Sequence, residues 1–127
     1  MMPQIVKSSA VFMMLVFGAS TQSFATDSVK LAPGYPQEWV TWTERWVNVA
    51  GTYLIAPNEQ IADVRLYFVV RDQFGNLAVG NVQGTFDPIH KTWHIQYGDP
   101  RLYAYQALVV VQRGTQKIPY WTQVYYW

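Results

Sequence analysis

Short runs of alternating apolar and polar residues, separated by turn-forming residues, constrain the fold of this chain more than any other feature. The clearest run is Val64–Arg71, in which every second residue from Val64 to Val70 is apolar. Because successive side chains of a β-strand point to opposite faces, this run predicts a strand with one apolar and one mixed face. The residues that follow, Asp72–Asn76, include Asp, Gly and Asn, which favour a turn.

Further runs of this kind follow along the second half of the chain. They predict strands at Leu77–Phe86, Trp93–Tyr97, Leu102–Arg113 and Ile118–Trp127. Gly80 and Gly84 interrupt the first of these strands, where glycine commonly marks a bulge or a close backbone approach. The run Leu102–Arg113 is apolar on both faces around its centre, which is typical of a strand covered on both sides. Pro119 cannot donate a backbone hydrogen bond, so we expect the last strand at the edge of a sheet.

The segment Trp39–Ala50 fits two kinds of secondary structure. Its residues Trp39, Trp42 and Trp46 recur at the spacing of one face of a helix. Tryptophan, valine and threonine, however, lose rotamer freedom in a helix and fit the pleated surface of a strand. We favour two strands, Trp39–Thr43 and Arg45–Ile55, with the helix as the alternative.

About seven or eight short strands separated by turn signals predict an all-β protein, a small antiparallel β-sandwich. The stretch Asp99–Leu108, which carries Tyr103 and Tyr105, resembles the tyrosine-bearing strand near the end of immunoglobulin-like and fibronectin type III domains. This resemblance implies an immunoglobulin-like or fibronectin type III-like sandwich, and it implies nothing about function.

The N-terminal residues 1–25 have the pattern of a secretory signal peptide. Lys7 precedes the apolar stretch Ala10–Ala19, and Ser23 and Ala25 are the small residues that a signal peptidase reads. The stretch is too short to span a membrane, which takes roughly 20 apolar residues. We therefore expect cleavage after Ala25, a periplasmic or secreted protein, and no stable membrane insertion. Residues 26–37 are predicted to be a flexible segment with a short edge strand near Val29–Leu31, and residues 38–127 the sandwich domain.

Charge and cysteine content exclude several kinds of function. Cleavage would remove Lys7 from the nine basic residues, so that the remainder equals the eight acidic residues. A neutral chain does not favour nucleic acid, which rewards a basic excess. The chain has no cysteine, which excludes a disulfide scaffold, a thiol active site and a lipidated cysteine.

No group of residues in the sequence predicts catalysis or metal binding. His90 and His94 are four residues apart, but we expect one in a turn and the other on a strand, where they do not share a face. After cleavage the only serine is Ser28, and Glu38 and Glu44 are the least implausible pair of catalytic acids. We expect no enzymatic activity, no cofactor and no metal.

Aromatic residues are the remaining candidates for function, since they make up 17% of the chain. Exposed rings bind flat sugar faces or anchor protein partners. The candidate binding residues form two groups, Trp39, Trp42 and Trp46 near the start of the sandwich and Trp121, Tyr125 and Trp127 in the last strand. We expect a protein partner bound at an aromatic surface or an edge strand. The alternative is a carbohydrate-binding module for a polysaccharide. Three coplanar exposed rings would favour sugar, and a protruding patch beside an unpaired edge would favour protein.

Overall fold

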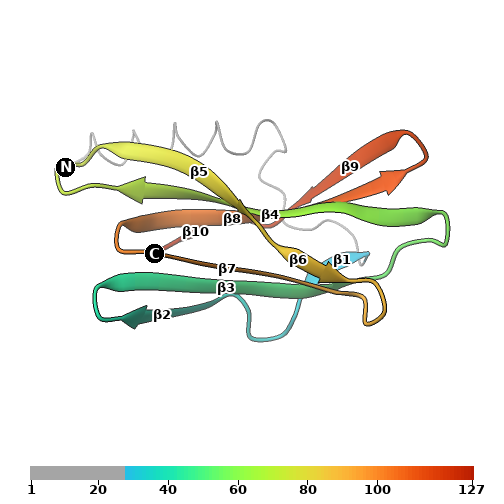
Figure 1. The fold of residues 1–127 in the computed structure, drawn as a ribbon, viewed down its shortest axis with the longest axis horizontal. Helices are drawn as coiled ribbons and strands as arrows, with labels where there is room; N and C mark the ends of the chain where they lie inside the picture. The colour runs from blue at the N-terminus through green and yellow to red at the C-terminus, as the bar shows by residue number, and fades with distance from the viewer. Residues whose placement is uncertain (1–27) are drawn as a thin grey trace.

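The fold consists of β-strands throughout the residues that this computed structural model describes, 28–127 (Figure 1). Residues 1–27, with the predicted signal peptide and its cleavage site, lie outside the described residues. The strands are β1 (Val29–Leu31), β2 (Gln37–Thr41), β3 (Glu44–Tyr53), β4 (Glu59–Arg71), β5 (Leu77–Gln83), β6 (Thr85–Asp87), β7 (Thr92–Asp99), β8 (Leu102–Arg113), β9 (Gln116–Trp121) and β10 (Tyr125–Tyr126).

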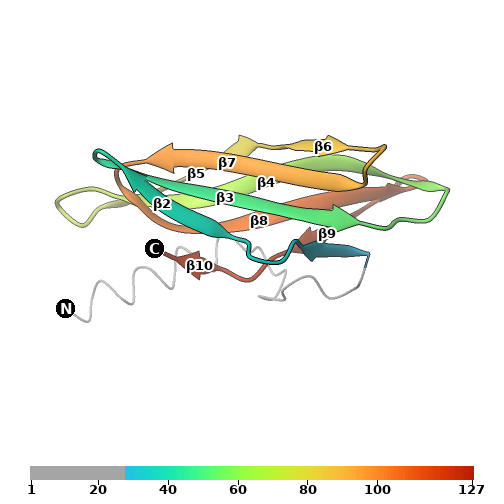
Figure 2. The ribbon, with the colours of Figure 1, turned by 90° about the horizontal axis from the view of Figure 1, so that it is seen from below.

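The strands form two antiparallel sheets that pack face to face as a β-sandwich (Figures 1 and 2). Sheet A has the order β1-β3-β7-β6, and β2 pairs with β3 on the same edge as β1. Sheet B has the order β10-β8-β4-β5, and β9 pairs with β8 on the same edge as β10. The prediction of an all-β sandwich is therefore confirmed.

The core lies between the two sheets and is built from the apolar face of each strand. Its large, fully buried side chains come from both sheets: Val47, Val49, Trp93 and Ile95 from sheet A, and Leu66, Leu102, Tyr105 and Val109 from sheet B. Burial of one such side chain stabilises the fold by about 1.5–3 kcal/mol. Strand β8 is the most buried of the described strands, and it lies inside sheet B, with β4 paired to one of its edges and β9 and β10 to the other.

The ambiguous segment Trp39–Ala50 is a β-hairpin, so the favoured prediction of two strands is confirmed and the helical alternative is wrong. Strand β3 points Val47 and Val49 into the core and Trp46 to the outer face of sheet A. The helix-like spacing of the tryptophans arises because Trp42 lies in the turn between β2 and β3 rather than in a strand.

The chain passes from one sheet to the other at Gly84, which splits the strand that was expected to run from Leu77 to Phe86. Strand β5 pairs with β4 in sheet B, whereas β6 pairs with β7 in sheet A (Figure 1). At this crossing the backbone approaches its neighbours closely. A Cβ on Gly84 would overlap the Ile95 side chain and would lie 2.6 Å from the carbonyl oxygen of His94.

The last strand is also split, into β9 and β10, by a bulge at Thr122. The Thr122 hydroxyl accepts a hydrogen bond from the Ala107 N–H (2.9 Å), and Gln106 Nε2 donates to the Thr122 carbonyl (3.0 Å). Both parts still pair with β8 and lie at the edge of sheet B, as the proline at position 119 predicted. The structure thus has ten strand segments where about seven or eight were expected.

Gly84→Ala is predicted to destabilise the protein, because the added methyl group overpacks the crossing between the sheets. We expect a loss of about 1–3 kcal/mol in the free energy of unfolding, measured by urea denaturation. Thr85→Ala changes an exposed neighbour and should stay within about 0.5 kcal/mol of the parent. Equal stability of the two variants would contradict the close approach at Gly84.

Candidate functional site

The hairpin of β2 and β3 brings together the predicted residues Trp39, Trp42 and Trp46. All the residues of β2 are exposed, although the strand contains Trp39 and Val40. Trp42 is 100% exposed and has a φ of 50°, at the first position of the two-residue turn. Positive φ is common for glycine and an outlier for a bulky residue, so this ring is held in solvent by a strained turn.

Trp39 and Trp46 form a stacked pair on the outer face of sheet A. They are directly opposite each other on β2 and β3, with ring centroids 6.1 Å apart and an angle of 13° between the planes. The Trp46 ring also lies over Gly98 of β7, where any Cβ would overlap the ring. The two rings and the glycine therefore form one continuous row across three strands.

Amide side chains form the adjacent row on the same outer face. Gln37, Asn48 and Gln96 occupy neighbouring positions on β2, β3 and β7. Asn48 Oδ1 is shielded from solvent and accepts no hydrogen bond from the described residues. The face therefore offers flat apolar rings beside hydrogen-bonding groups.

The outer edge of β2 is open, since within residues 28–127 this strand pairs with β3 alone. Thr41 and Glu44 are partners across the two-residue turn, which requires them to be a hydrogen-bonded pair. Backbone bonding alternates along an antiparallel pair, so the N–H and C=O groups of Glu38 and Val40 point away from β3. Val40 is 60% exposed beside these groups.

A hydrogen bond to sheet B holds this open strand in place. The Tyr105 hydroxyl donates to Glu38 Oε2 at 2.6 Å. Burial, together with this hydrogen bond and the negative charge of Glu38, raises the pKa of Tyr105. The only charged side chain of β2 is therefore turned toward the other sheet, although Glu38 remains exposed.

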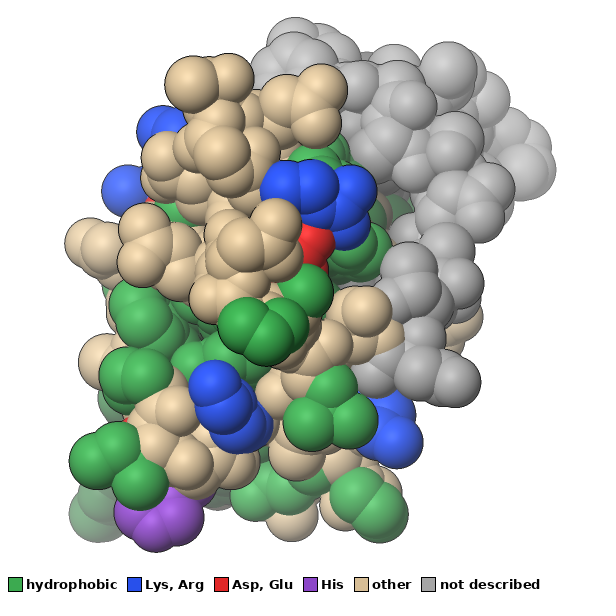
Figure 3. Space-filling view, turned by 90° about the vertical axis from the view of Figure 1, so that its right-hand side faces the viewer, with side chains coloured by type: hydrophobic (Ala, Val, Ile, Leu, Met, Phe, Trp, Pro, Cys, Tyr) green, Lys and Arg blue, Asp and Glu red, His purple; other side chains and the backbone are tan. Residues whose placement is uncertain are grey.

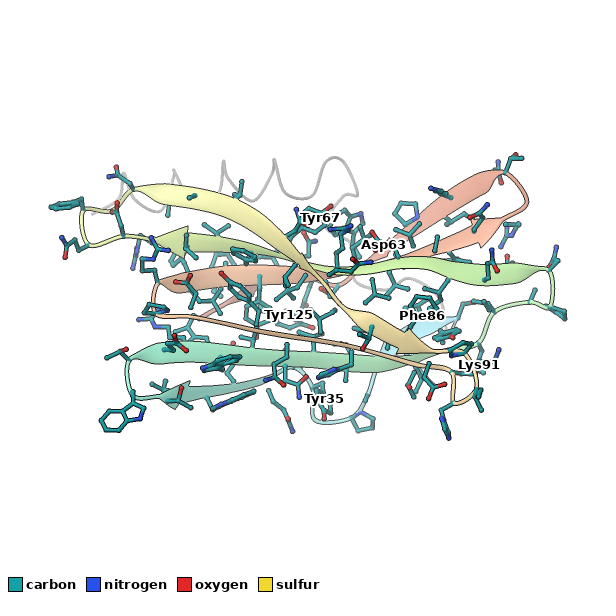
Figure 4. The ribbon with its side chains drawn as sticks, viewed as in Figure 1. Tyr35, Asp63, Tyr67, Phe86, Lys91 and Tyr125 are labelled. Carbon is teal, nitrogen blue, oxygen red and sulfur yellow. The ribbon has the colours of Figure 1, made fainter. Side chains whose placement is uncertain are left out.

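The aromatic residues of the last strand take part in packing. Trp121 is 8% exposed and its ring centroid lies 5.4 Å from that of Tyr67. Tyr125 points between the sheets and stacks on Tyr105 at 5.4 Å (Figure 4). Trp127 packs against the core and lies under the Arg45 guanidinium, 5.6 Å from the ring centroid. The bulge at Thr122 re-aims the residues that follow it, so the predicted C-terminal group does not form one exposed surface.

The opposite end of the sandwich carries exposed apolar residues of a different kind. Leu54 and Ile89 are exposed there, and Figure 3 shows hydrophobic side chains separated by basic and polar ones. In the same region His90 Nδ1 lies 2.6 Å from Asp87 Oδ2. This side-chain hydrogen bond is the main cause of the lowered pKa of Asp87.

The histidines and the candidate acids are not brought together. His94 of β7 is opposite Ala50, six residues along β3 from Glu44, which corresponds to roughly 20 Å. Glu38 faces sheet B, whereas His94 lies on the outer face of sheet A. Among residues 28–127 no three His, Cys, Asp or Glu side chains form a group that could hold a metal.

No family model matches the chain, and no curated protein or solved structure matches it either. In the described part of the chain, no helix has the length and apolar character needed to cross a membrane. We therefore infer function from the geometry of the hairpin.

Sequence reasoning missed Val40, Gln37, Asn48 and Gln96 as parts of this site. The first two could have been found from their alternation with Trp39, once β2 is taken as a strand. The positions of Asn48 and Gln96 depend on the pairing of β3 with β7, which no local pattern predicts.

The stacked ring pair should give an exciton-coupled signal in circular dichroism. We expect Trp39→Phe and Trp46→Phe each to abolish this signal, because the coupling needs both indoles. Trp42→Phe is the matched control, since this ring has no aromatic partner among residues 28–127, and it should leave the signal intact. A spectrum that depends equally on all three tryptophans would contradict the stacked arrangement.

The stability of the turn before β7 should depend on pH through Asp87. Its folded-state pKa is lowered, so its contribution is fully present above the unfolded value of about 3.9 and is lost as pH falls through the folded value. An NMR titration of the Asp87 carboxyl group should show a midpoint below that value. His90→Ala should move the midpoint upward, and an unchanged midpoint would contradict the role of the hydrogen bond.

Proposed function

We propose that this protein is a non-enzymatic binding domain that adds an extended segment of a protein partner to the open edge of β2. One observation carries the proposal: β2 is exposed along its whole length while the backbone groups of Glu38 and Val40 point away from β3. A partner strand would satisfy these groups by main-chain hydrogen bonds, as in other cases of strand addition.

The composition of β2 supports this proposal. Natural proteins usually protect edge strands with lysine, proline, a bulge or an inward-pointing charge. The strand Gln37–Thr41 contains no lysine and no proline. Its one charge, Glu38, is turned toward sheet B and accepts a hydrogen bond from the Tyr105 hydroxyl, so Glu38 is the one protection of this kind on β2. Val40 beside the edge and Trp42 at its end offer apolar contacts, and a buried tryptophan is among the residues that dominate binding energy.

We further propose that the sandwich is of the immunoglobulin-like type. In that type one sheet has the strand order ABED and the other contains CFG, with an extra strand beside C in some members. The order here supports it if β1 and β2 together are taken as A, β3 as B, β4 as C and β5 as the extra strand. Then β6, β7, β8 and β9–β10 follow as D, E, F and G.

Export also belongs to the proposal. The pattern of residues 1–25 supports secretion to the periplasm or beyond, and the predicted mature chain is neutral and free of cysteine. Recognition would then depend on backbone pairing and shape rather than on long-range attraction. N-terminal sequencing of the exported protein tests the predicted cleavage after Ala25.

Strand addition is best tested with a proline on the open edge. Val40→Pro removes an N–H that points toward the partner and leaves the bonds to β3 in place. The matched control is Val79→Pro on β5, the edge strand of sheet B. The Asp72 N–H donates to the Asn76 carbonyl, so these two residues are a hydrogen-bonded pair and the next pair, Arg71 and Leu77, is not. Bonded and non-bonded pairs alternate along an antiparallel ladder. Val79, two residues beyond Leu77, is therefore also in a non-bonded pair, and its N–H points away from β4.

Peptides that bind the domain are first selected by display. They should bind the parent and Val79→Pro with equal affinity. Val40→Pro should lower their affinity at least about tenfold, or about 1.4 kcal/mol. Trp42→Ala should weaken peptide binding by about 2 kcal/mol if the ring is an anchor. Binding that survives Val40→Pro in a folded variant would refute strand addition at β2.

A second candidate is carbohydrate binding on the outer face of sheet A. The observation that favours it is the row of Trp39 and Trp46 beside the amides of Gln37, Asn48 and Gln96. Tryptophan fluorescence during titration with polysaccharides and peptidoglycan fragments tests it. Asn48→Ala should weaken sugar binding and leave peptide binding unchanged, and no response to any glycan would exclude this candidate.

A further inference from the structure

A cleft rich in arginine lies at the end of the sandwich where the β2–β3, β4–β5 and β7–β8 turns meet, on the left of Figure 1. It has a volume of about 190 Å³ and is lined in part by Arg45, Arg71, Arg101 and Tyr103. That volume corresponds to roughly six water molecules, which suits one small polar group.

The guanidinium groups are held in position by rings and backbone. Arg71 lies over the Tyr103 ring, 4.5 Å from its centroid, and within residues 28–127 it has no carboxylate within ion-pair distance. Arg45 Nη1 donates to the Leu102 carbonyl at 2.8 Å. The Arg71 N–H donates to the Arg101 carbonyl at 2.9 Å, which fixes the two arginines beside each other. A positioned guanidinium with unused donors is ready for an external acceptor.

Asp72, which lines the cleft, and Asp99, which pairs with the lining residue Arg101, already have partners. Asp99 accepts hydrogen bonds from the Arg101 N–H, the Arg101 side chain and the Tyr97 hydroxyl. Burial by itself would raise the pKa of Asp99, but the hydrogen bonds and the positive charge of Arg101, together with the hydrogen bond from Tyr97, lower that pKa. Asp72 Oδ1 accepts from the N–H groups of Phe74 and Asn76 within its own turn. Neither acid is free to neutralise Arg45 or Arg71.

We propose that this cleft binds a single carboxylate group, with Arg71 as the bidentate donor and Arg45 as the second cation. The charges favour a carboxylate over a phosphate. Arg101 is already paired with Asp99 beside the cleft. The remaining charged lining residues, Arg45, Arg71 and Asp72, leave one net positive charge, which a monoanion neutralises. Phosphate groups carry about −1.5 to −2 at neutral pH and would leave excess negative charge beside Asp72.

The carboxylate has two possible sources, a free small acid or the terminal carboxylate of a peptide chain. The test is an NMR titration of the full-length protein with acetate, with an acetylated tetrapeptide that has a free C-terminus, and with the same peptide amidated at its C-terminus. Inorganic phosphate and chloride at equal ionic strength are the ion controls. The amide signals of Arg71, Arg101 and Tyr103 report on the cleft.

Saturable shifts of these signals with acetate and with the free-acid peptide, and not with the amidated peptide, would support the proposal. Tighter binding of the free-acid peptide than of acetate would assign the source to a chain terminus, and equal binding would assign it to a small acid. Arg71→Gln should weaken binding at least about fivefold, and Arg71→Lys should recover only part of the loss because lysine cannot bind bidentately.

Lys117→Gln removes one positive charge from an exposed site on β9 and serves as the matched control. It should leave the affinity unchanged, and a thermal unfolding curve shows whether each variant is folded. Three outcomes would overturn the proposal: no saturable shift in the parent protein, tighter binding of phosphate than of acetate, or an equal loss in Lys117→Gln and Arg71→Gln.

Discussion

Burial of one face of each sheet against the other is the interaction on which the rest of this structure depends. The inward rows of sheet A, such as Val47 and Val49, meet Leu66 and Val109 of sheet B. A slip of one residue would expose every side chain in such a row, so the core fixes the register of each strand. Because Val47 and Val49 point inward, Trp46 and Asn48 must point outward. The same constraint that stabilises the fold therefore places the aromatic and amide rows on the surface.

A two-layer sandwich leaves edges and ends that its core does not use, and the proposed sites lie there. The edge strand β2 is tied to sheet B by the bond from Tyr105 to Glu38, yet its outer backbone groups face no strand in residues 28–127. The arginine cleft lies at the end of the sandwich, where three turns meet. The two sites are close, because Arg45 of β3 is paired with Val40 of β2. A peptide partner could thus pair with the edge while a carboxylate is bound at the end.

Local patterns predicted most strands, because alternation and turn residues act over a few neighbours. The predicted Leu102–Arg113 is β8, and the short strand near Val29–Leu31 is β1. The close backbone approach at Gly84 was predicted from the glycine, but the change of sheet there and the break at Thr122 were missed. Both depend on contacts with residues distant in sequence, Ile95 and Ala107. The same limit applies to the sites. The hairpin tryptophans could be predicted as a group, whereas the packing of Trp121 and Tyr125 depends on partners in β4 and β8. The arginine cleft was missed because its members come from the ends of different strands.

The proposed function requires that the outer edge of β2 is unpaired and available for a partner strand. Amide hydrogen exchange in the free protein tests it most directly, because bonded and open amides alternate along this strand. We expect the amides of Glu38 and Val40 to exchange at least about tenfold faster than those of Trp39 and Thr41. Equal protection of all four amides would show that another part of the chain already occupies the edge, and it would refute an open edge at β2.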